Sequence, residues 1–274
     1  MSTILVTGAT GNVGRHVTSQ LAEAGLEVRA LVRDPERARL PGRVEVVRGD
    51  LTEPATLEPA LKDVESVFLL WPAFTADHVA EVVTAVAEHA RRVVYLSANV
   101  PDEPPAHYHE IERLIRHSGL GWTFLRPGGF AANTLGWADQ IRQGVVRWPY
   151  GQAARSLIHE RDIAAVAVHV LTSAGHNGAT YVLTGPEQLT QAEQVRVIGA
   201  AVGREVRWEE LPADVAREQL VAAWGDAGFV DRALKAWASF VTAPEPVTDT
   251  VERLLGRPAL TLGEWARDHA SDFS

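Results

Sequence analysis

The chain has 274 residues, of which 46% are hydrophobic and 22% charged, and its formal net charge is −9. This composition is typical of a globular protein with a sizeable core, and it excludes a disordered or fibrous chain. Because cysteine is absent, disulfides, thiolate nucleophiles and iron–sulfur clusters are excluded. The acidic charge argues against nucleic acid as a partner. The first residues resemble neither a signal peptide nor a membrane span, so we expect a cytoplasmic protein with no membrane partner.

The first 130 residues alternate short apolar runs with stretches of helical period, which is typical of βαβ units around a parallel sheet. Predicted strands are Thr3–Thr7, Glu27–Val32, Arg43–Val47, Ser66–Leu70, Val93–Ser97 and Trp122–Arg126. Predicted helices are Asn12–Ala24 and Ala76–Ala90, and the second carries valines at three- and four-residue spacing that mark one buried stripe. The pattern predicts an α/β fold with a doubly wound parallel sheet of the Rossmann type.

The character of the sequence changes after about residue 130, where six of the eight tryptophans occur. Helices are predicted at Asp162–Thr172, Thr190–Ala201, Ala213–Trp224, Phe229–Val241 and Leu262–His269, with extended chain at Glu205–Trp208. We therefore divide the chain into a nucleotide-binding domain, 1–150, and a smaller, mainly helical substrate domain, 151–274. A strand at Thr180–Thr184 is expected to return to the sheet, so the boundary is not a single cut. The tryptophans either line a pocket or fill gaps between helices.

The strongest local motif is TILVTGATGNVGRHV, in which Gly8, Gly11 and Gly14 lie between a predicted strand and a predicted helix. In this context the first glycine permits a tight turn, the second lets the backbone approach a pyrophosphate, and the third allows close packing of helix and strand. The free amides at the start of the helix attract phosphate charge. The motif therefore predicts a dinucleotide site.

The residues after the second predicted strand bear on the choice between NADP and NAD. Arg33 follows this strand and Arg37 comes one helical turn later, where a 2′-phosphate would be bound, so we expect NADP. Asp34 lies between them and is the kind of residue that would instead hold the free ribose of NAD. The alternative is that both arginines are solvated loop charges.

The segments TGATGNVG, LVRDPERA, GDLTEPATL, ERLIRHSGLGWTFLRPGGFAAN and HERDIAAVA, in this order, resemble the NmrA-like branch of the atypical short-chain dehydrogenases/reductases over roughly the first 185 residues. The resemblance implies a Rossmann domain, NADP(H) in a cleft, and either reduction of quinone-like or conjugated substrates or a redox-sensing role without catalysis. We expect the cofactor to contact Gly8, Thr10, Gly11, Asn12, Val13, Gly14, Arg33, Arg37, Asp50, Leu51, Leu70, Trp71, Pro72, Ser97, Pro127, Gly128 and Phe130.

Ordinary members of the wider superfamily reduce carbonyls with a serine and a Tyr-x-x-x-Lys motif. Here Ser97 and Tyr108 match the serine and the tyrosine, but Glu112 stands at the lysine position. A carboxylate one helical turn away is expected to raise the pKa of the phenol above about 10, which makes Tyr108 a poor acid near neutral pH. His107 is a further candidate proton donor. We expect catalytic roles for Tyr108, Ser97 and His107, and no metal site.

These considerations predict hydride transfer from NADPH to a conjugated, largely apolar acceptor such as a quinone or an aromatic polyketide-like carbonyl. Candidate substrate-binding residues are Trp71, Phe130, Asn133, Trp137, Trp148 and His159. Two alternatives remain open: an NADP(H)-sensing regulator of a protein partner, and an isomerase or cyclase that uses the cofactor as a scaffold. The protein is expected to be a monomer or a homodimer.

Overall fold

The computed structural model describes residues 3–73, 75–100 and 107–274. Contacts within the chain divide it into two compact units. The first unit comprises Met1–Gly128, Glu160–Leu183 and Thr250–Arg257, and the second comprises Gly129–His159, Thr184–Asp249 and Pro258–Ser274. In this division the first break falls after Gly128 and not at residue 150, and two later segments of the chain return to complete the first unit.

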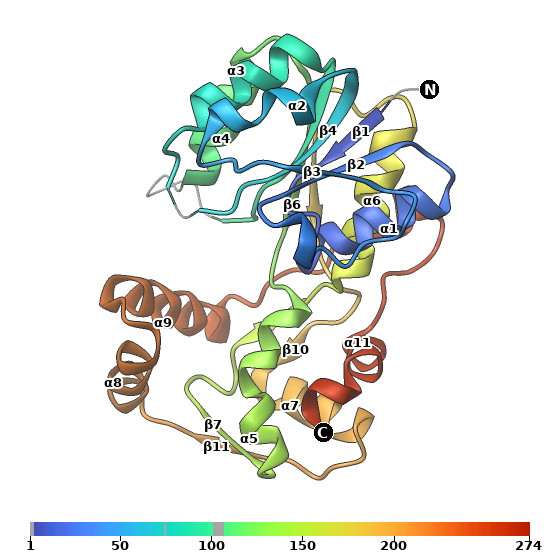
Figure 1. Ribbon diagram of the computed structural model, residues 1–274. Helices are drawn as coiled ribbons and strands as arrows, with labels where there is room; N and C mark the ends of the chain where they lie inside the picture. Colours follow the sequence, from blue (N-terminus) through green and yellow to red (C-terminus); the bar gives the residue numbers. More distant parts are fainter. Residues whose placement is uncertain (1–2, 74, 101–106) are drawn as a thin grey trace. The chain divides into compact units, whose positions relative to one another are not determined.

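The first unit is built on a sheet of seven parallel strands in the order β3-β2-β1-β4-β5-β6-β9 (Figure 1). The strands are β1 (Thr3–Val6), β2 (Val28–Val32), β3 (Glu45–Arg48), β4 (Val64–Leu70), β5 (Arg92–Leu96), β6 (Gly121–Pro127) and β9 (Ala179–Leu183). This confirms the predicted Rossmann sheet, including the late strand that pairs with β6. The order reverses at β1, and open α/β sheets bind their ligands beside such a reversal.

Helices cover both faces of this sheet, with α2, α3 and α4 on one face and α1 and α6 on the other (Figure 1). The helices of the first unit are α1 (Gly14–Glu23), α2 (Glu58–Leu61), α3 (Val79–His89), α4 (His107–His117), α6 (Glu160–Thr172) and α10 (Thr250–Leu255). The predicted valine stripe of α3 is buried in the core against β4 and β5. The periodicity of the sequence therefore identified the packed face of α3 correctly.

The second unit is mainly helical, as predicted, and contains two small two-stranded sheets. Its elements are α5 (Ala138–Arg142), β7 (Val145–Trp148), β8 (Ala154–Arg155), β10 (Leu189–Thr190), α7 (Gln191–Ala201), β11 (Arg207–Glu210), α8 (Ala213–Trp224), α9 (Ala227–Thr242) and α11 (Leu262–Asp268). Strand β11 pairs with β7 in parallel, and β10 pairs with β8 antiparallel. Capping boxes at Thr190 and Thr261 start α7 and α11.

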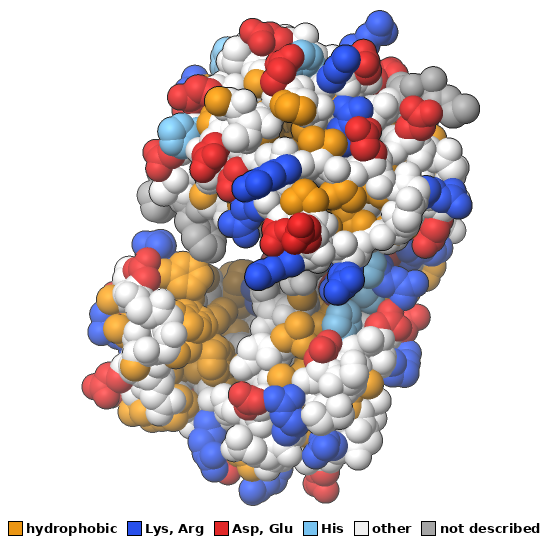
Figure 2. Space-filling model, in the orientation of Figure 1, with side chains coloured by type: hydrophobic (Ala, Val, Ile, Leu, Met, Phe, Trp, Pro, Cys, Tyr) orange, Lys and Arg blue, Asp and Glu red, His pale blue; other side chains and the backbone are white. Residues whose placement is uncertain are grey.

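Helices α8 and α9 form a hairpin with a small core of its own. Helix α8 ends at Gly225, whose φ of +75° suits glycine, and Asp226 caps the start of α9. Trp224 and Phe229 remain 42% and 39% exposed. Figure 2 shows hydrophobic side chains gathered over these two helices. In the described part of the chain, none of the helices is long and apolar enough to cross a bilayer.

Candidate active site

The glycine-rich turn connects β1 to α1 at the point where the strand order reverses. Gly8 has a φ of +60°, and a Cβ there would lie 3.2 Å from the Leu70 side chain. A Cβ on Gly14 would lie 2.0 Å from the carbonyl oxygen of Gly8. The hydroxyl of Thr7 accepts from the Leu70 amide at 2.8 Å and donates to the Leu70 carbonyl at 3.1 Å. The helix therefore starts in direct contact with the turn, and only glycine fits at Gly14.

The start of α1 offers free amides. In the part of the chain that the structure describes, the amides of Asn12, Val13 and Gly14 donate to no protein acceptor. Thr10, Gly11 and Asn12 are exposed, so a ligand can approach this backbone closely. Unpaired amides at a helix start bind anions such as a pyrophosphate. The residues present therefore fit a dinucleotide.

The charged side chains that follow β2 differ in whether they have a partner. Asp34 accepts from the Glu36 amide at 3.2 Å and pairs with Arg37 at 3.2 Å. Arg33 is exposed and, among the described residues, has no ion pair. The carboxylate that would hold the ribose of NAD is thus used to cap the 3₁₀ helix Pro35–Arg37. Asp34 therefore pairs with Arg37 and leaves Arg33 without a carboxylate partner among the described residues.

Most of the other predicted cofactor contacts lie at the ends of strands in the first unit. Asp50 accepts from the amide and the hydroxyl of Thr52, both at 2.9 Å, and Leu51 is buried in the core. Trp71 is 8% exposed and its indole donates to the Thr75 carbonyl at 2.7 Å. Pro127 ends β6, and the Gly128 amide donates to Leu183 at 3.0 Å. Phe130 is the exception, because it belongs to the second unit.

Glu112 lies at the centre of a buried ionic network in the first unit. Its carboxylate is fully buried and accepts from the Ser97 hydroxyl at 2.7 Å. Arg126 donates to both of its oxygens at 2.8 and 2.6 Å, and Arg116 donates to one at 2.8 Å. Burial alone would raise the pKa of Glu112, but the hydrogen bonds from Arg126 and Ser97 and the two positive charges hold it below its usual value. The Ser97 proton is therefore directed at a carboxylate.

Tyr108 lies on the first turn of α4, half-buried against the core of the first unit. Its pKa is raised, as expected, but the cause is burial. The expected contribution of Glu112 to this shift is wrong, because burial of the phenol is its cause. The ring of His107 lies 3.9 Å from the Tyr108 ring, and burial lowers its pKa. His107 is therefore mainly neutral at pH 7, and neither side chain is an activated acid.

The second unit contains a cavity of about 330 Å³, within the usual size range of ligand sites. Of the predicted substrate residues, Asn133, Trp137 and Trp148 line it. Trp71, Phe130 and His159 do not, and His159 is 1% exposed with its ring nitrogen 3.3 Å from an Asp268 oxygen. Lining residues outside that prediction include Arg155, Gln191, Gln194, Trp224, Phe229 and Trp237. Both interpretations of the tryptophans hold, since Trp265 fills the core whereas Trp148 lines the cavity.

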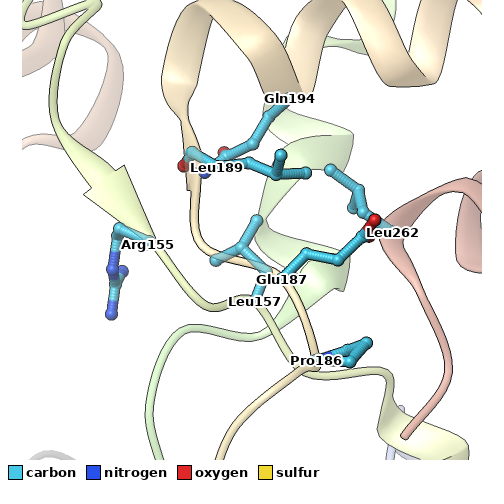
Figure 3. A pocket seen from close by; sticks show the side chains of 7 residues that line it. All are labelled: Arg155, Leu157, Pro186, Glu187, Leu189, Gln194 and Leu262. Carbon is cyan, nitrogen blue, oxygen red and sulfur yellow. Dashed lines mark hydrogen bonds between the residues drawn. The ribbon is translucent and has the colours of Figure 1, made fainter. Parts of the chain in front are cut away.

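A smaller gap adjoins this cavity and shares Arg155, Leu157 and Gln194 with it. Figure 3 shows that the Arg155 side chain extends away from the other residues of this gap. Its guanidinium is therefore directed away from the smaller gap, and Arg155 also lines the larger cavity. Among the described residues, no group of three or more His, Asp or Glu side chains is arranged to hold a metal ion.

Comparisons with known proteins identify the family. The family model described as "NAD(P)H-binding" matches residues 8–174. The chain is 42% identical to a (4-alkanoyl-5-oxo-2,5-dihydrofuran-3-yl)methyl phosphate reductase of Streptomyces griseus, covering 99% of both chains. It is 37% identical to an NAD(P)H azoreductase of Xenophilus azovorans, covering 98% of this chain and 99% of the other.

Among solved structures, the NADPH complex of a quinone oxidoreductase from Escherichia coli superposes with a TM-score of 0.81 at 25% identity, covering 97% and 99% of the two chains. The chain belongs to the NAD(P)H-binding family, in the NmrA-like group of atypical short-chain dehydrogenases/reductases, and it is an NAD(P)H-dependent reductase. The resemblance seen in the sequence is confirmed. These three relatives give no support to the sensor or to the isomerase.

The close contact at Gly14 predicts the effect of adding one methyl group. We expect Gly14→Ala to lower the free energy of unfolding by about 1–3 kcal/mol, because the new Cβ overlaps the Gly8 carbonyl and the turn must shift. Gly42→Ala is the control, since a Cβ there meets nothing within 4 Å. Urea unfolding measures both. Equal stability of the two variants would contradict the proposed contact.

The buried network predicts a large effect of Glu112→Gln. We expect a loss of about 3–5 kcal/mol of folding free energy, because Arg126 and Arg116 keep their charges without a carboxylate. The folded-state pKa of Glu112 lies below the value of about 4.3 in an unfolded chain. Its contribution is therefore complete above that pH and is lost as the pH falls through the folded pKa. Unfolding curves of wild type and variant should converge on acidification.

Glu110→Gln is the matched control for this measurement. Glu110 lies on the same helix and pairs with Arg113, but both side chains are exposed. Exposed pairs contribute little to stability, so this variant should unfold almost as wild type does. A loss as large as that of the Glu112 variant would show that the charge of α4, and not burial of the network, sets the stability.

Proposed function

We propose that the protein transfers hydride from NADPH to a conjugated carbonyl compound, such as an enone, an unsaturated lactone or a quinone. The observation that carries this proposal is the bond from Ser97 to the buried Glu112, beside a Tyr108 whose pKa is raised by burial. Reduction of an isolated ketone produces an alkoxide, which requires a matched proton donor. A conjugated acceptor spreads the incoming charge over its π-system, so water can supply the proton.

The residues of the chain would bind and orient the reactants. The amides of Asn12, Val13 and Gly14 would hold the pyrophosphate, and Arg33 would hold the 2′-phosphate that distinguishes NADPH from NADH. The bound cofactor supplies the hydride with its two electrons. In an enone or an unsaturated lactone the hydride would add at the carbon β to the carbonyl and a proton from water would complete the saturated product, whereas a quinone would take up the hydride and a proton to become a hydroquinone. The protein would thus contribute mainly the relative position of the reactants.

The relatives support this class of acceptor. The substrate named for the Streptomyces griseus enzyme is a dihydrofuranone with an alkanoyl group, so its ring double bond is conjugated with carbonyl groups. The other two reduce azo compounds and quinones, which are also conjugated electron acceptors. The aromatic cavity of the second unit suits the apolar body of such a substrate. A small-molecule substrate and a cytoplasmic location are part of the proposal.

Turnover of matched substrates tests the reaction class. An α,β-unsaturated lactone and its saturated counterpart are each incubated with protein and NADPH, and loss of NADPH absorbance is followed. We expect the unsaturated compound to be preferred by about a hundredfold or more, equal to roughly 2.7 kcal/mol. Tyr108→Phe should keep most of this activity. Equal turnover of a saturated ketone, or none across a panel of enones and quinones, would contradict the proposal.

Replacing Arg33 tests whether the protein prefers NADPH to NADH. We expect Arg33→Ala to weaken NADPH binding by about 10–100-fold, because a charge-assisted hydrogen bond to the 2′-phosphate is lost. Binding of NADH should hardly change, since NADH lacks that phosphate. Arg39→Ala is the control, as Arg39 is exposed on the same loop outside the predicted site. Calorimetric titration of each variant with both nucleotides gives the ratio, and an equal loss for NADPH and NADH would exclude this role of Arg33.

A further inference from the structure

Two donors on residues that line the cavity of the second unit lack an acceptor. In the described residues, Trp148 Nε1 and Arg155 Nε are buried and make no hydrogen bond. A buried donor without a partner destabilises a protein, and such groups in native structures call for an explanation. We propose that this cavity binds the non-reacting part of the substrate, an apolar chain or ring with one uncharged carbonyl oxygen that accepts from Trp148 and Arg155. The inference rests on the proposed function.

The apolar character of the ligand follows from the walls of the cavity. The Trp148 ring lies 5.4 Å from the Trp237 ring, 6.2 Å from Trp137 and 6.4 Å from Trp224, measured between centroids. Phe229 and Leu157 extend this lining. Flat apolar or aromatic groups pack well against such rings.

Among the other polar side chains of the lining, those of Gln191, Gln194 and Thr134 have hydrogen-bond partners, whereas Asn133 is exposed. Gln191 Nε2 donates to the carbonyls of Pro149 and Tyr150 at 3.1 and 3.0 Å, and Gln194 Nε2 donates to Leu189 at 2.8 Å. The Thr134 hydroxyl donates to the carbonyl of Ala131 at 2.7 Å. In the described part of the lining, Trp148 and Arg155 therefore stand out as the residues whose donors are both buried and unpartnered, and we assign the orientation of the ligand to them.

Arg155 is held in place before any ligand arrives. Its guanidinium lies 4.6 Å from the centroid of the Phe240 ring, and its Nη2 donates to Glu245 at 3.1 Å. It also packs on Gly129, where a Cβ would lie 2.8 Å from the guanidinium carbon. The side chain points away from the smaller gap nearby (Figure 3). A donor that is positioned in advance costs little ordering on binding.

The charge balance of the cavity favours an uncharged oxygen. Glu245 is 4% exposed, and it balances Arg155. Apart from Arg155, none of the described residues that line the cavity carries a charged side chain. A carboxylate or phosphate would bring an additional negative charge into this site with no cation left to match it, which is unfavourable. A neutral carbonyl uses the donors without that cost.

Access to the donors requires a side chain to move. Both donor atoms are covered by their neighbours, and Trp224 is the exposed ring that contacts Trp148. We therefore expect ligand entry to displace Trp224, which changes the environment of at least two indoles. Tryptophan fluorescence then reports binding without any turnover.

The test titrates the protein, without nucleotide, with three probes of similar size. They are the neutral ketone 4-phenylbutan-2-one, the hydrocarbon butylbenzene and the anion 4-phenylbutanoate. Dissociation constants come from tryptophan fluorescence and are checked by calorimetry. We expect the ketone to bind about tenfold more tightly than the hydrocarbon and than the carboxylate. Equal binding of ketone and hydrocarbon, or tighter binding of the carboxylate, overturns the inference.

Variants assign the preference to the two donors. Trp148→Phe keeps an aromatic ring but removes the N–H, and Arg155→Met keeps the length of the side chain but removes its donors. Each should bring the ratio of ketone to hydrocarbon binding below about threefold. Trp208→Phe is the control, because that indole donates to Glu210 and lies outside the lining. A preference that survives both cavity variants overturns the assignment.

This measurement is independent of the proposed reaction. If the ketone preference holds but no enone is reduced, the proposed function fails and the binding site stands. If enones are reduced but the three probes bind equally, the reaction stands and this inference fails.

Discussion

The contact between Gly14 and the carbonyl of Gly8 is the constraint on which the rest of the first unit depends. Because no Cβ intervenes, α1 begins directly beside the end of β1, and the amides at its start have no acceptor in the described chain, at the reversal of strand order. The same approach brings Gly8 against Leu70 at the end of β4. One steric condition thus creates both the packing of the first helix and the anion site.

The network around Glu112 determines which proton donors the first unit offers. A short-chain reductase with a lysine near its tyrosine has a cation that assists proton transfer. Here the corresponding position holds Glu112, and its charge is balanced by Arg126 and Arg116 within the first unit. The network is therefore a source of stability for α4 and β6 more than a source of protons. Our proposal of a substrate that needs little acid catalysis rests on the presence of Glu112 at this position.

Sequence patterns predicted the first unit well, because continuous apolar strands and the α3 valine stripe are local signals that tertiary packing reinforces. Short elements such as β8 and β10, of two residues each, carry no periodicity and were missed. The partners of Glu112 were also missed. Arg116 has a local signal, since it lies four residues further along the same helix, whereas Arg126 comes from a strand and only the fold brings it close. Likewise, only the fold brings Arg155 on β8 to α9, the helix that carries Trp237 and Phe240.

The return of the chain to the first unit affects how this unit folds during synthesis. Strand β9 (Ala179–Leu183) comes after the first segment of the second unit, and helix α10 (Thr250–Leu255) comes after most of that unit. During synthesis on the ribosome the open edge of β6 stays without its neighbour until β9 has emerged, and open strand edges promote association with other chains. The sheet is therefore complete only once Leu183 has left the ribosome, and α10 joins the same unit near the end of synthesis.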